Sequence, residues 1–274
     1  MKRSLGIGVV LLAFCVSPSA DAEVEKAGGF SFVTEKGEVK GAGGNTSSGS
    51  VRVACPGKTR VVSGGLGSDA ASSTFTFNGV PYDDGDGDKK PDDGWRLIGT
   101  NYAAGKVKIE GEAVCTKKLK PSYPAESQKV GAHSQAAVAV TCPGDRVAVG
   151  GGMTGGVGMN SSYPSSETWG MWADNYTDKK KKVESVAVCV DPNLRLEFDS
   201  SSGTIGPDLP GGGFSSCASG EVGISGGHSN SGGFSTIGIR GLNPSPGGFG
   251  YAIDNYSDQT ISITTHTVCF DPSV

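Results

Sequence analysis

The feature that most limits how this chain can fold is a pattern of residues that occurs three times along it. In each copy a cysteine is followed nine residues later by a Gly-Gly pair, an aromatic residue precedes an Asn-Tyr pair by six residues, and a second cysteine lies fourteen residues after that Asn. These positions are Cys55, Gly64, Trp95, Asn101 and Cys115; Cys142, Gly151, Trp169, Asn175 and Cys189; and Cys217, Gly226, Phe249, Asn255 and Cys269. A motif that recurs at fixed internal spacing indicates a repeated structural unit.

We expect a single β domain over residues 51–274 that contains three repeats, at 51–116, 136–191 and 214–271. The segments outside the repeats are rich in Gly, Ser, Pro or charged residues. We therefore predict that residues 23–50 form a flexible N-terminal arm, and that residues 117–135 and 192–213 join the repeats along the surface.

Within each repeat, apolar and polar residues alternate with a period of two, as at Val107–Ile109 and Ile261–Ile263. Successive side chains of a strand point to opposite faces, so this alternation predicts half-buried strands. Glycine destabilises helix interiors, and it makes up 45 of the 274 residues, which argues against a mainly helical fold. Each repeat is predicted to form about four short strands.

A sheet of that size buries too little apolar surface to be stable alone, so the repeats must pack against one another. We expect an all-β, three-sheet, β-prism-like architecture with pseudo-threefold repeats, in which Trp95, Trp169 and Phe249 face a shared core. A β-propeller normally has more blades. A β-trefoil is the nearest alternative, but its repeats are shorter than the 87 and 75 residues that separate the opening cysteines.

The N-terminus has the parts of a secretory signal peptide: a basic start, an apolar stretch over residues 5–16 and small residues up to Ala22. We predict that residues 1–22 are removed and that the protein is secreted, to the extracellular space or the periplasm. Lipoprotein processing at Cys15 is the alternative, and the bulky Phe14 in front of this cysteine disfavours it.

Cleavage after Ala22 leaves six cysteines, and an even number in an exported chain indicates disulfide bonds. A metal-thiolate site is the alternative, but no Cys/His cluster with zinc spacing occurs. Two pairings treat the repeats alike. One joins Cys55 to Cys115, Cys142 to Cys189 and Cys217 to Cys269, and the other joins Cys115 to Cys142, Cys189 to Cys217 and Cys55 to Cys269. We favour the first pairing, within repeats, because the closing strand can lie beside the opening one.

Three Cys-to-Cys units that open with a turn such as Cys55-Pro56-Gly57 and carry a Gly pair resemble the β-prism of the vitelline membrane outer layer protein I group. The similarity spans Val51 to Asp271 and lies in the pattern more than in identical residues. The repeats are also similar to those of uncharacterised secreted bacterial proteins. This resemblance implies an extracellular structural or sugar-binding role and supplies no catalytic residue.

The first repeat carries an acidic loop with aspartates at the alternate positions Asp84, Asp86 and Asp88. Calcium takes about six to eight oxygen ligands, and alternate carboxylates on a Gly-rich loop can converge on it. We predict a Ca²⁺ site formed by these three residues and closed by Asp92 or Asp93, because the stretch resembles the acidic loops of thrombospondin type 3 and dockerin-like repeats. The alternative is a solvated loop whose aspartates only favour turns.

The repeated Asn-Tyr and Gly-Gly pairs each allow two interpretations. An Asn and an aromatic ring can bind a sugar, but we expect an architectural role, with Asn satisfying backbone groups at the strand end and Tyr covering the hairpin. Glycine-rich turns can hold phosphate, but that arrangement needs a helix or a backbone nest. Close crossing of strands explains the Gly pairs better.

Few residues are candidates for catalysis. The three histidines (His133, His228 and His266) lie outside any nucleophile motif. The net charge of −4 gives no reason to expect nucleic acid as a partner, and no apolar run is long enough to span a membrane. We predict a secreted, non-enzymatic structural or adhesive protein that binds an extracellular glycan or a cell-surface component. An exported hydrolase or transferase acting on glycans is the main alternative, and an inhibitor or toxin is a third.

Overall fold

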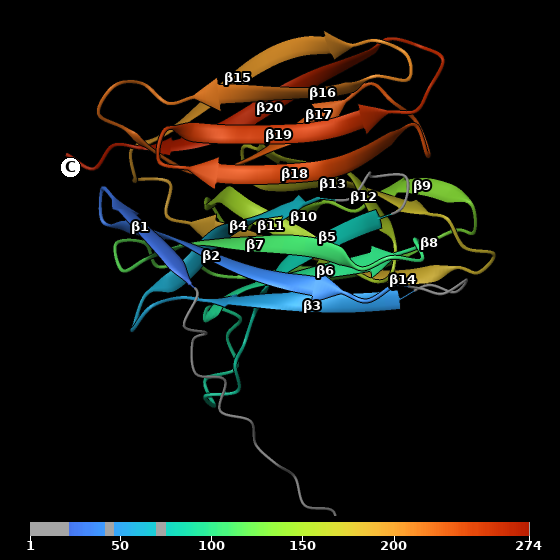
Figure 1. The fold of residues 1–274 in the computed structure, drawn as a ribbon. Helices are drawn as coiled ribbons and strands as arrows, with labels where there is room; N and C mark the ends of the chain where they lie inside the picture. Colours follow the sequence, from blue (N-terminus) through green and yellow to red (C-terminus); the bar gives the residue numbers. More distant parts are fainter. Residues whose placement is uncertain (1–21, 42–46, 70–74, 274) are drawn as a thin grey trace, which may run out of the picture.

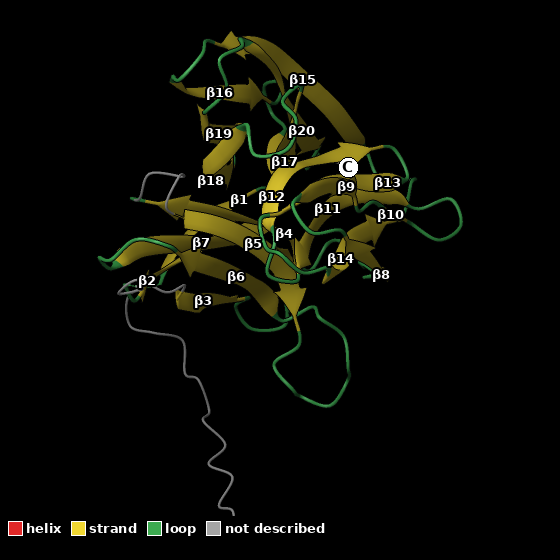
Figure 2. Ribbon diagram, turned by 90° about the vertical axis from the view of Figure 1, so that its right-hand side faces the viewer, coloured by secondary structure: helices red, strands yellow, loops and turns green. Residues whose placement is uncertain are grey.

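The structure, a computed structural model, describes residues 22–41, 47–69 and 75–273. These residues form strands joined by turns and loops, without any helix, so the predicted all-β fold is confirmed (Figures 1 and 2). The described part accordingly contains no helix able to cross a membrane. The predicted signal peptide lies outside the described residues except for Ala22, which directly precedes strand β1 (Glu23–Ala27).

The other strands fall into three sets, which we call segments 1, 2 and 3. Segment 1 comprises β2 (Phe30–Val39), β3 (Ser47–Ala54), β4 (Arg60–Ser68), β5 (Phe75–Tyr82), β6 (Gly94–Asn101) and β7 (Val107–Thr116). Segment 2 comprises β8 (Ala125–Val130), β9 (Ser134–Ala137), β10 (Val140–Thr141), β11 (Val147–Thr154), β12 (Gly158–Ser165), β13 (Thr168–Asn175) and β14 (Lys181–Val190). Segment 3 comprises β15 (Leu196–Ile205), β16 (Pro210–Ser216), β17 (Val222–Asn230), β18 (Ile237–Ser245), β19 (Gly248–Asn255) and β20 (Ile261–Phe270). Figure 1 shows segment 3, in orange and red, above segment 1.

The strands of each segment pair in two antiparallel groups. In the first group, the strand that ends in the closing cysteine lies between the Gly-pair strand and a strand from before the repeat. This gives the orders β2-β7-β4, β8-β14-β11 and β15-β20-β17. In the second group, the strand with the aromatic residue lies in the middle, in the orders β3-β6-β5, β10-β13-β12 and β16-β19-β18, and β9 also pairs with β13. The same strand orders therefore occur in all three segments.

The regions outside the predicted repeats differ from expectation. Residues 23–50, expected to form a flexible arm, instead contain β1, β2 and the start of β3, and β2 pairs with β7 along its whole length. The joining residues 117–135 and 192–213 contain β8 and β15, which pair with the closing strands β14 and β20. Each segment thus has more strands than the four predicted, because the closing strand needs a partner on its outer edge.

The segments contact one another in a cycle. Segment 1 meets segment 3 where Leu66 of β4 pairs with Leu242 of β18. Segment 3 meets segment 2 where His228 of β17 pairs with Ser162 of β12. Between segments 2 and 1, β11 and β5 pack together without a named ladder. Every Gly-pair strand (β4, β11 or β17) therefore lies against the outer strand of another segment's second group (β18, β5 or β12).

The Gly pairs make these approaches possible. A Cβ atom on the first glycine, Gly64, Gly151 or Gly226, would overlap the ring of Trp95, Trp169 or Phe249 of the same segment. A Cβ atom on the second glycine, Gly65, Gly152 or Gly227, would overlap the carbonyl oxygen of Leu242, Gly79 or Ser162 in the neighbouring segment. The predicted close crossing of strands is therefore what the structure contains at each pair.

The apolar core follows the same arrangement. Trp95, Trp169 and Phe249 are buried, as predicted, but Trp95 and Phe249 belong to one apolar cluster and Trp169 to another. A further cluster takes residues from all three segments: Val62, Val149 and Ile224 from the Gly-pair strands, and Val114, Val188 and Val268 from the positions before the closing cysteines. Burying a side chain of this size stabilises a fold by about 1.5–3 kcal/mol, so a core shared in this way makes the segments mutually dependent.

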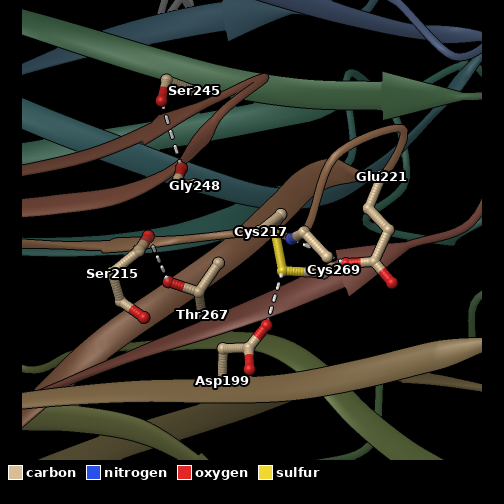
Figure 3. Close-up of a disulfide and its surroundings, with 9 residues drawn as sticks. Asp199, Ser215, Cys217, Glu221, Ser245, Gly248, Thr267 and Cys269 are labelled. Carbon is tan, nitrogen blue, oxygen red and sulfur yellow. Dashed lines mark hydrogen bonds between the residues drawn. A yellow bond between two sulfur atoms is a disulfide. The ribbon is translucent and has the colours of Figure 1, made fainter.

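The disulfides join each opening cysteine to the closing cysteine of the same segment: Cys55 to Cys115, Cys142 to Cys189 and Cys217 to Cys269. This is the favoured within-repeat pairing. Figure 3 shows the bond of segment 3, where the Thr267 hydroxyl also donates to the Ser215 carbonyl at 3.0 Å. The opening and closing ends of the segment are thus held together both covalently and by hydrogen bonding.

Candidate binding site: a tyrosine-lined cavity

The tyrosines of the three Asn-Tyr pairs, far apart in the sequence, line one cavity of about 370 Å³. This volume lies in the range of roughly 300–1,000 Å³ that is usual for small-molecule sites. Strands β5, β12 and β18, one from each segment, and Ser235 just before β18 supply the rest of the lining. The lining residues are Tyr102, Tyr176, Tyr256, Thr76, Phe77, Gly158, Met159, Ser235, Ile237, Gly238 and Ile239. These described lining residues thus combine aromatic rings, aliphatic side chains and hydroxyl groups, and none of them is charged.

The asparagines before the tyrosines are buried, and each holds its hairpin in the same way. The side-chain amide donates to the carbonyl four residues later, and the side-chain oxygen accepts from the amide two residues later. The amide bonds are Asn101–Gly105 at 2.8 Å, Asn175–Lys179 at 2.9 Å and Asn255–Gln259 at 2.8 Å. The oxygens accept from Ala103, Thr177 and Ser257. The architectural role predicted for Asn is therefore what its contacts show.

Because Asn sets the hairpin, the tyrosine after it takes an equivalent place in each segment. These tyrosines differ from the expectation that they only cover the hairpins, since all three reach the shared cavity. The side chains of Tyr102 and Tyr256 are 45% and 39% exposed, so they are open to a ligand from solution. Tyr176 is more enclosed, and its ring lies 5.5 Å from that of Phe234.

The hydroxyls of two tyrosines donate to carboxylates two residues earlier in the chain. Tyr176 donates to Asp174 at 3.2 Å and Tyr256 to Asp254 at 3.1 Å. In segment 1 the corresponding residue is Thr100, and the Tyr102 hydroxyl instead lies 3.5 Å from the Thr76 hydroxyl. The cavity wall is therefore backed by acidic groups in segments 2 and 3 only.

Asp174 is fully buried and accepts hydrogen bonds from neutral groups alone. Besides Tyr176, these are the Ser235 amide at 3.0 Å, the Gln135 side chain at 2.9 Å and the Asn160 side chain at 3.4 Å. Burial raises the pKa of Asp174 above its usual value, and these bonds oppose that rise. Asp254 differs because Arg240 forms an ion pair with it at 3.3 Å.

The predicted calcium ligands lie in the loop between β5 and β6, which projects from the body of the molecule (Figures 1 and 2). Within this loop, Asp84, Asp86 and Asp88 each accept a hydrogen bond from the backbone amide two residues later, at 2.8–2.9 Å. These bonds fold the loop into successive turns. Such turn formation is what the solvated-loop alternative predicts for aspartates.

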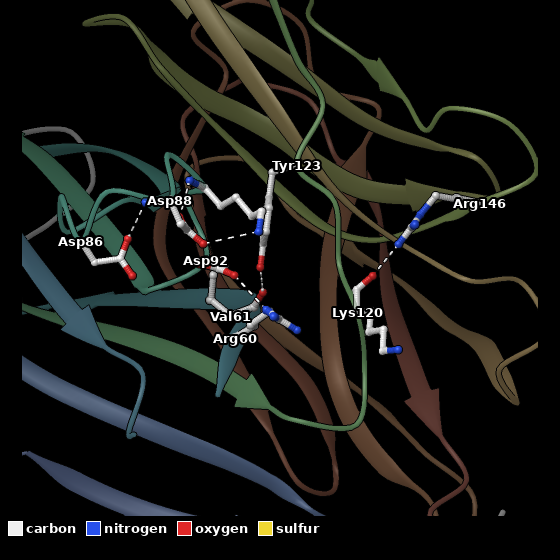
Figure 4. A network of polar contacts seen from close by, with 9 residues as sticks. Arg60, Val61, Asp86, Asp88, Asp92, Lys120, Tyr123 and Arg146 are labelled. Carbon is white, nitrogen blue, oxygen red and sulfur yellow. Dashed lines mark hydrogen bonds and ion pairs between the residues drawn. The ribbon is translucent and has the colours of Figure 1, made fainter. Parts of the chain in front are cut away.

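The structure does not bring the five predicted ligands together. Asp92 is buried and pairs with Arg60 at 2.9 Å, apart from Asp86 (Figure 4). The carboxylates that do approach one another within 4.8 Å are those of Asp83, Asp84 and Asp93. Sequence spacing missed Asp83, because the loop folds back to place its first residues beside its last.

A second hollow, also of about 370 Å³, lies between β1, β2, β7 and the turn after β18. Glu112 of β7 lines it together with Glu23 and Glu25. One buried oxygen of the Glu112 carboxylate has no hydrogen-bond partner, and burial raises its pKa to about 8, with a smaller contribution from Glu110. Glu112 is therefore mostly protonated at neutral pH. Sequence inspection did not single it out, because alternation places it on the polar face of its strand.

The histidines are not part of the tyrosine-lined cavity. His228 is fully buried at the contact of β17 with β12, where its Nε2 lies 2.8 Å from the Asn160 carbonyl. Burial lowers the pKa of His228 to about 4, so its ring is neutral at physiological pH. His266 stacks on Tyr163, and His133 pairs with Asp178 at 2.7 Å in exposed loops.

No protein-family model matches the chain, and a search of the curated proteins finds no match to it. The tyrosine-lined cavity is thus the candidate functional site on its geometry alone.

Proposed function

We propose that the protein is an exported, non-enzymatic protein that holds a carbohydrate in the tyrosine-lined cavity. The observation that carries this proposal is the convergence of Tyr102, Tyr176 and Tyr256 on one cavity. A sugar ring has an apolar face that packs against aromatic rings, and its hydroxyls bond to polar groups such as those of Thr76 and Ser235. The mixed aromatic and hydroxyl lining suits both properties.

The architecture we propose is a β-prism with pseudo-threefold repeats, as the resemblance to the vitelline membrane outer layer protein I group implies. The recurring strand orders and the cyclic contacts between segments support it. In this proposal one disulfide-stapled scaffold presents a site at the place where its three segments meet. Such a rigid scaffold suits a structural or adhesive role outside the cell.

The proposed location is extracellular or periplasmic. Three disulfides support it, because disulfides form and persist in oxidising compartments. The predicted signal peptide over residues 1–22 would direct the export.

Calcium binding by the acidic loop is a separate proposal. The approach of Asp83, Asp84 and Asp93 supports it, and Asp86 and Asp88 lie in the same exposed loop. Oxygen ligands of this kind suit Ca²⁺. In this role the ion would order the loop, and the tyrosine-lined cavity would not depend on it.

The alternative, an exported hydrolase or transferase acting on glycans, is favoured by Glu112. A carboxyl group that stays protonated at neutral pH and faces a hollow has the property required of a general acid. This alternative predicts that polysaccharide incubated with the protein releases reducing ends, and that Glu112→Gln abolishes the release. Binding without such release favours the non-enzymatic proposal.

The proposed function is tested by probing a glycan array with the disulfide-bonded protein and with Tyr102→Ala and Tyr256→Ala variants. Both tyrosines are partly exposed, so we expect the variants to fold and to lose binding by at least about tenfold. Tyr82→Ala is the matched control, because Tyr82 lies outside the cavity lining. Array binding that survives both cavity substitutions contradicts the proposal.

A further inference from the structure

We propose that the ligand of the tyrosine-lined cavity carries a positive charge, and that it is a sugar with a protonated amino group. This inference rests on the proposed function, since it names the class of carbohydrate that the cavity takes. Its evidence is distinct, because it comes from the charges and hydrogen bonds around the tyrosines and from the electrostatics of their rings, and not from their convergence on one cavity.

The first step is the charge behind the cavity wall. The Asp174 carboxylate accepts four hydrogen bonds, and all four donors are neutral. Within the described residues, none of the ion pairs includes Asp174, whereas Asp254 is paired with Arg240. Although burial opposes ionisation, four donors to the two oxygens favour the carboxylate form of Asp174, and no ion pair of the described residues offsets that charge. A buried charge of this kind acts on its surroundings more strongly than a hydrated one.

The second step is the state of the tyrosine hydroxyls. The Tyr176 and Tyr256 hydroxyls donate their hydrogen bonds to Asp174 and Asp254, so toward a ligand their oxygens can only accept. An ammonium group has donors and no acceptor, and it therefore complements these oxygens. A neutral sugar hydroxyl also donates, but it brings no charge that the nearby carboxylates would stabilise.

The third step is the rings themselves. The face of an aromatic ring is negative and attracts a cation, most strongly when the cation has left water. Three tyrosine rings line the cavity and none of the lining residues that the structure describes is charged, so no cation among these residues competes for the rings. The rings, the accepting oxygens and the carboxylate of Asp174 all favour the same ligand charge.

The test compares three oligosaccharides of equal length and linkage that differ only at the second carbon: one bears a free amine, one an N-acetyl group and one a hydroxyl. Isothermal titration at pH 6 should show that the amino form binds at least about tenfold more tightly than the other two. Raising the salt concentration should weaken binding of the amino form alone. Equal affinity for the three sugars would overturn the inference and leave carbohydrate binding intact.

Two variants and one small ion separate the possible outcomes. Asp174→Asn should lower the affinity for the amino form much more than the affinity for the neutral sugars, and Tyr256→Phe should reduce the preference for the amine. Asp145→Asn, an exposed change of the same charge, is the control and should change nothing. Tetramethylammonium serves as a probe without a sugar. If it binds through Asp174 and no sugar binds, the charge inference holds and the proposed function fails.

Discussion

The centre of the molecule and the tyrosine-lined cavity are both formed by all three segments, but the segments resemble one another more closely at the centre. There, every Gly pair meets an aromatic ring on one side and a neighbouring carbonyl group on the other. At the cavity, the tyrosines take equivalent places while the groups behind them differ, with Asp174, Asp254 and Thr100 at the corresponding positions.

The difference follows from what each position touches. Where two backbones meet, no side chain fits, so the residue must be glycine in each segment. Where a residue faces or backs a cavity, several side chains fit, and the residues can differ between segments without loss of the fold. We conclude that contacts at the centre require the same residues in every segment, whereas contacts at the cavity do not.

The largest expected effect comes from removing a disulfide. The bonds span 60, 47 and 52 residues, and the chain-entropy model gives a loss of about 4 kcal/mol for each. Replacing both cysteines of one bond by serine should therefore lower the free energy of unfolding by similar amounts in segments 1, 2 and 3. Urea unfolding measures this quantity. A bond whose loss has no effect would show that its segment does not share the fold of the others.

The next largest effect is expected at the second glycine of a pair. In Gly227→Ala, the new methyl group would overlap the Ser162 carbonyl and push β17 from β12, lowering the free energy of unfolding by about 3 kcal/mol or more. Gly203→Ala is the matched control, since nothing lies within 4 Å of a Cβ atom at that strand position. If the two variants unfold alike in urea, close approach at the centre is not what the glycines provide.

A third prediction concerns how stability depends on pH through the residue that follows the Gly pair. Segments 1 and 2 have the buried apolar residues Leu66 and Met153 there, whereas segment 3 has His228. The pKa of His228 is about 4 when folded and 6.5 when unfolded, so its contribution is present above pH 6.5 and is lost as the pH falls toward 4. The loss amounts to roughly 3 kcal/mol.

His228→Met should make the stability of segment 3 less sensitive to acid. The comparison with the unmodified protein is needed because Glu112, with its pKa raised to about 8, changes stability in the opposite direction over the same pH range. Burial also lowers the pKa of His266, but this residue is present in both proteins, so its contribution cancels in the comparison. Identical pH profiles of the melting temperature for the two proteins would rule out His228 as the source of acid sensitivity.

The smallest effect is expected in the acidic loop, which only segment 1 possesses. Asp84→Asn should change the free energy of unfolding without calcium by less than about 0.5 kcal/mol, since the residue is exposed. The same variant should abolish the heat of Ca²⁺ binding. Asp92→Asn, which removes the pairing with Arg60, should lower stability by about 1 kcal/mol or less and leave that heat in place. No heat from the unmodified protein at millimolar calcium would remove the calcium proposal.

The sequence predicts the all-β fold and the buried Trp95, Trp169 and Phe249, because both depend on local alternation and on the repeated spacing. It does not reveal β15. Most side chains of this strand are exposed, so buried and exposed positions do not alternate along it. Pairing with β20, a long-range contact, is what makes residues 196–205 a strand.

The candidate site was only partly predictable for a related reason. The equal spacing of Tyr102, Tyr176 and Tyr256 from the cysteines indicates equivalent places in three segments, but it does not show that these places face one another. That depends on how the segments close, which is a property of contacts between residues far apart in the chain. The burial of Asp174 and Glu112 depends on the same contacts.

Counting ligands tests most directly whether the three segments build one common site. The glycan that binds most tightly on the array is titrated into the disulfide-bonded protein by calorimetry, and the number bound per chain is measured. One ligand per chain is predicted, with binding lost when any of the three tyrosines is replaced by alanine. Three equivalent ligands per chain would contradict the account, because each segment would then carry a site of its own.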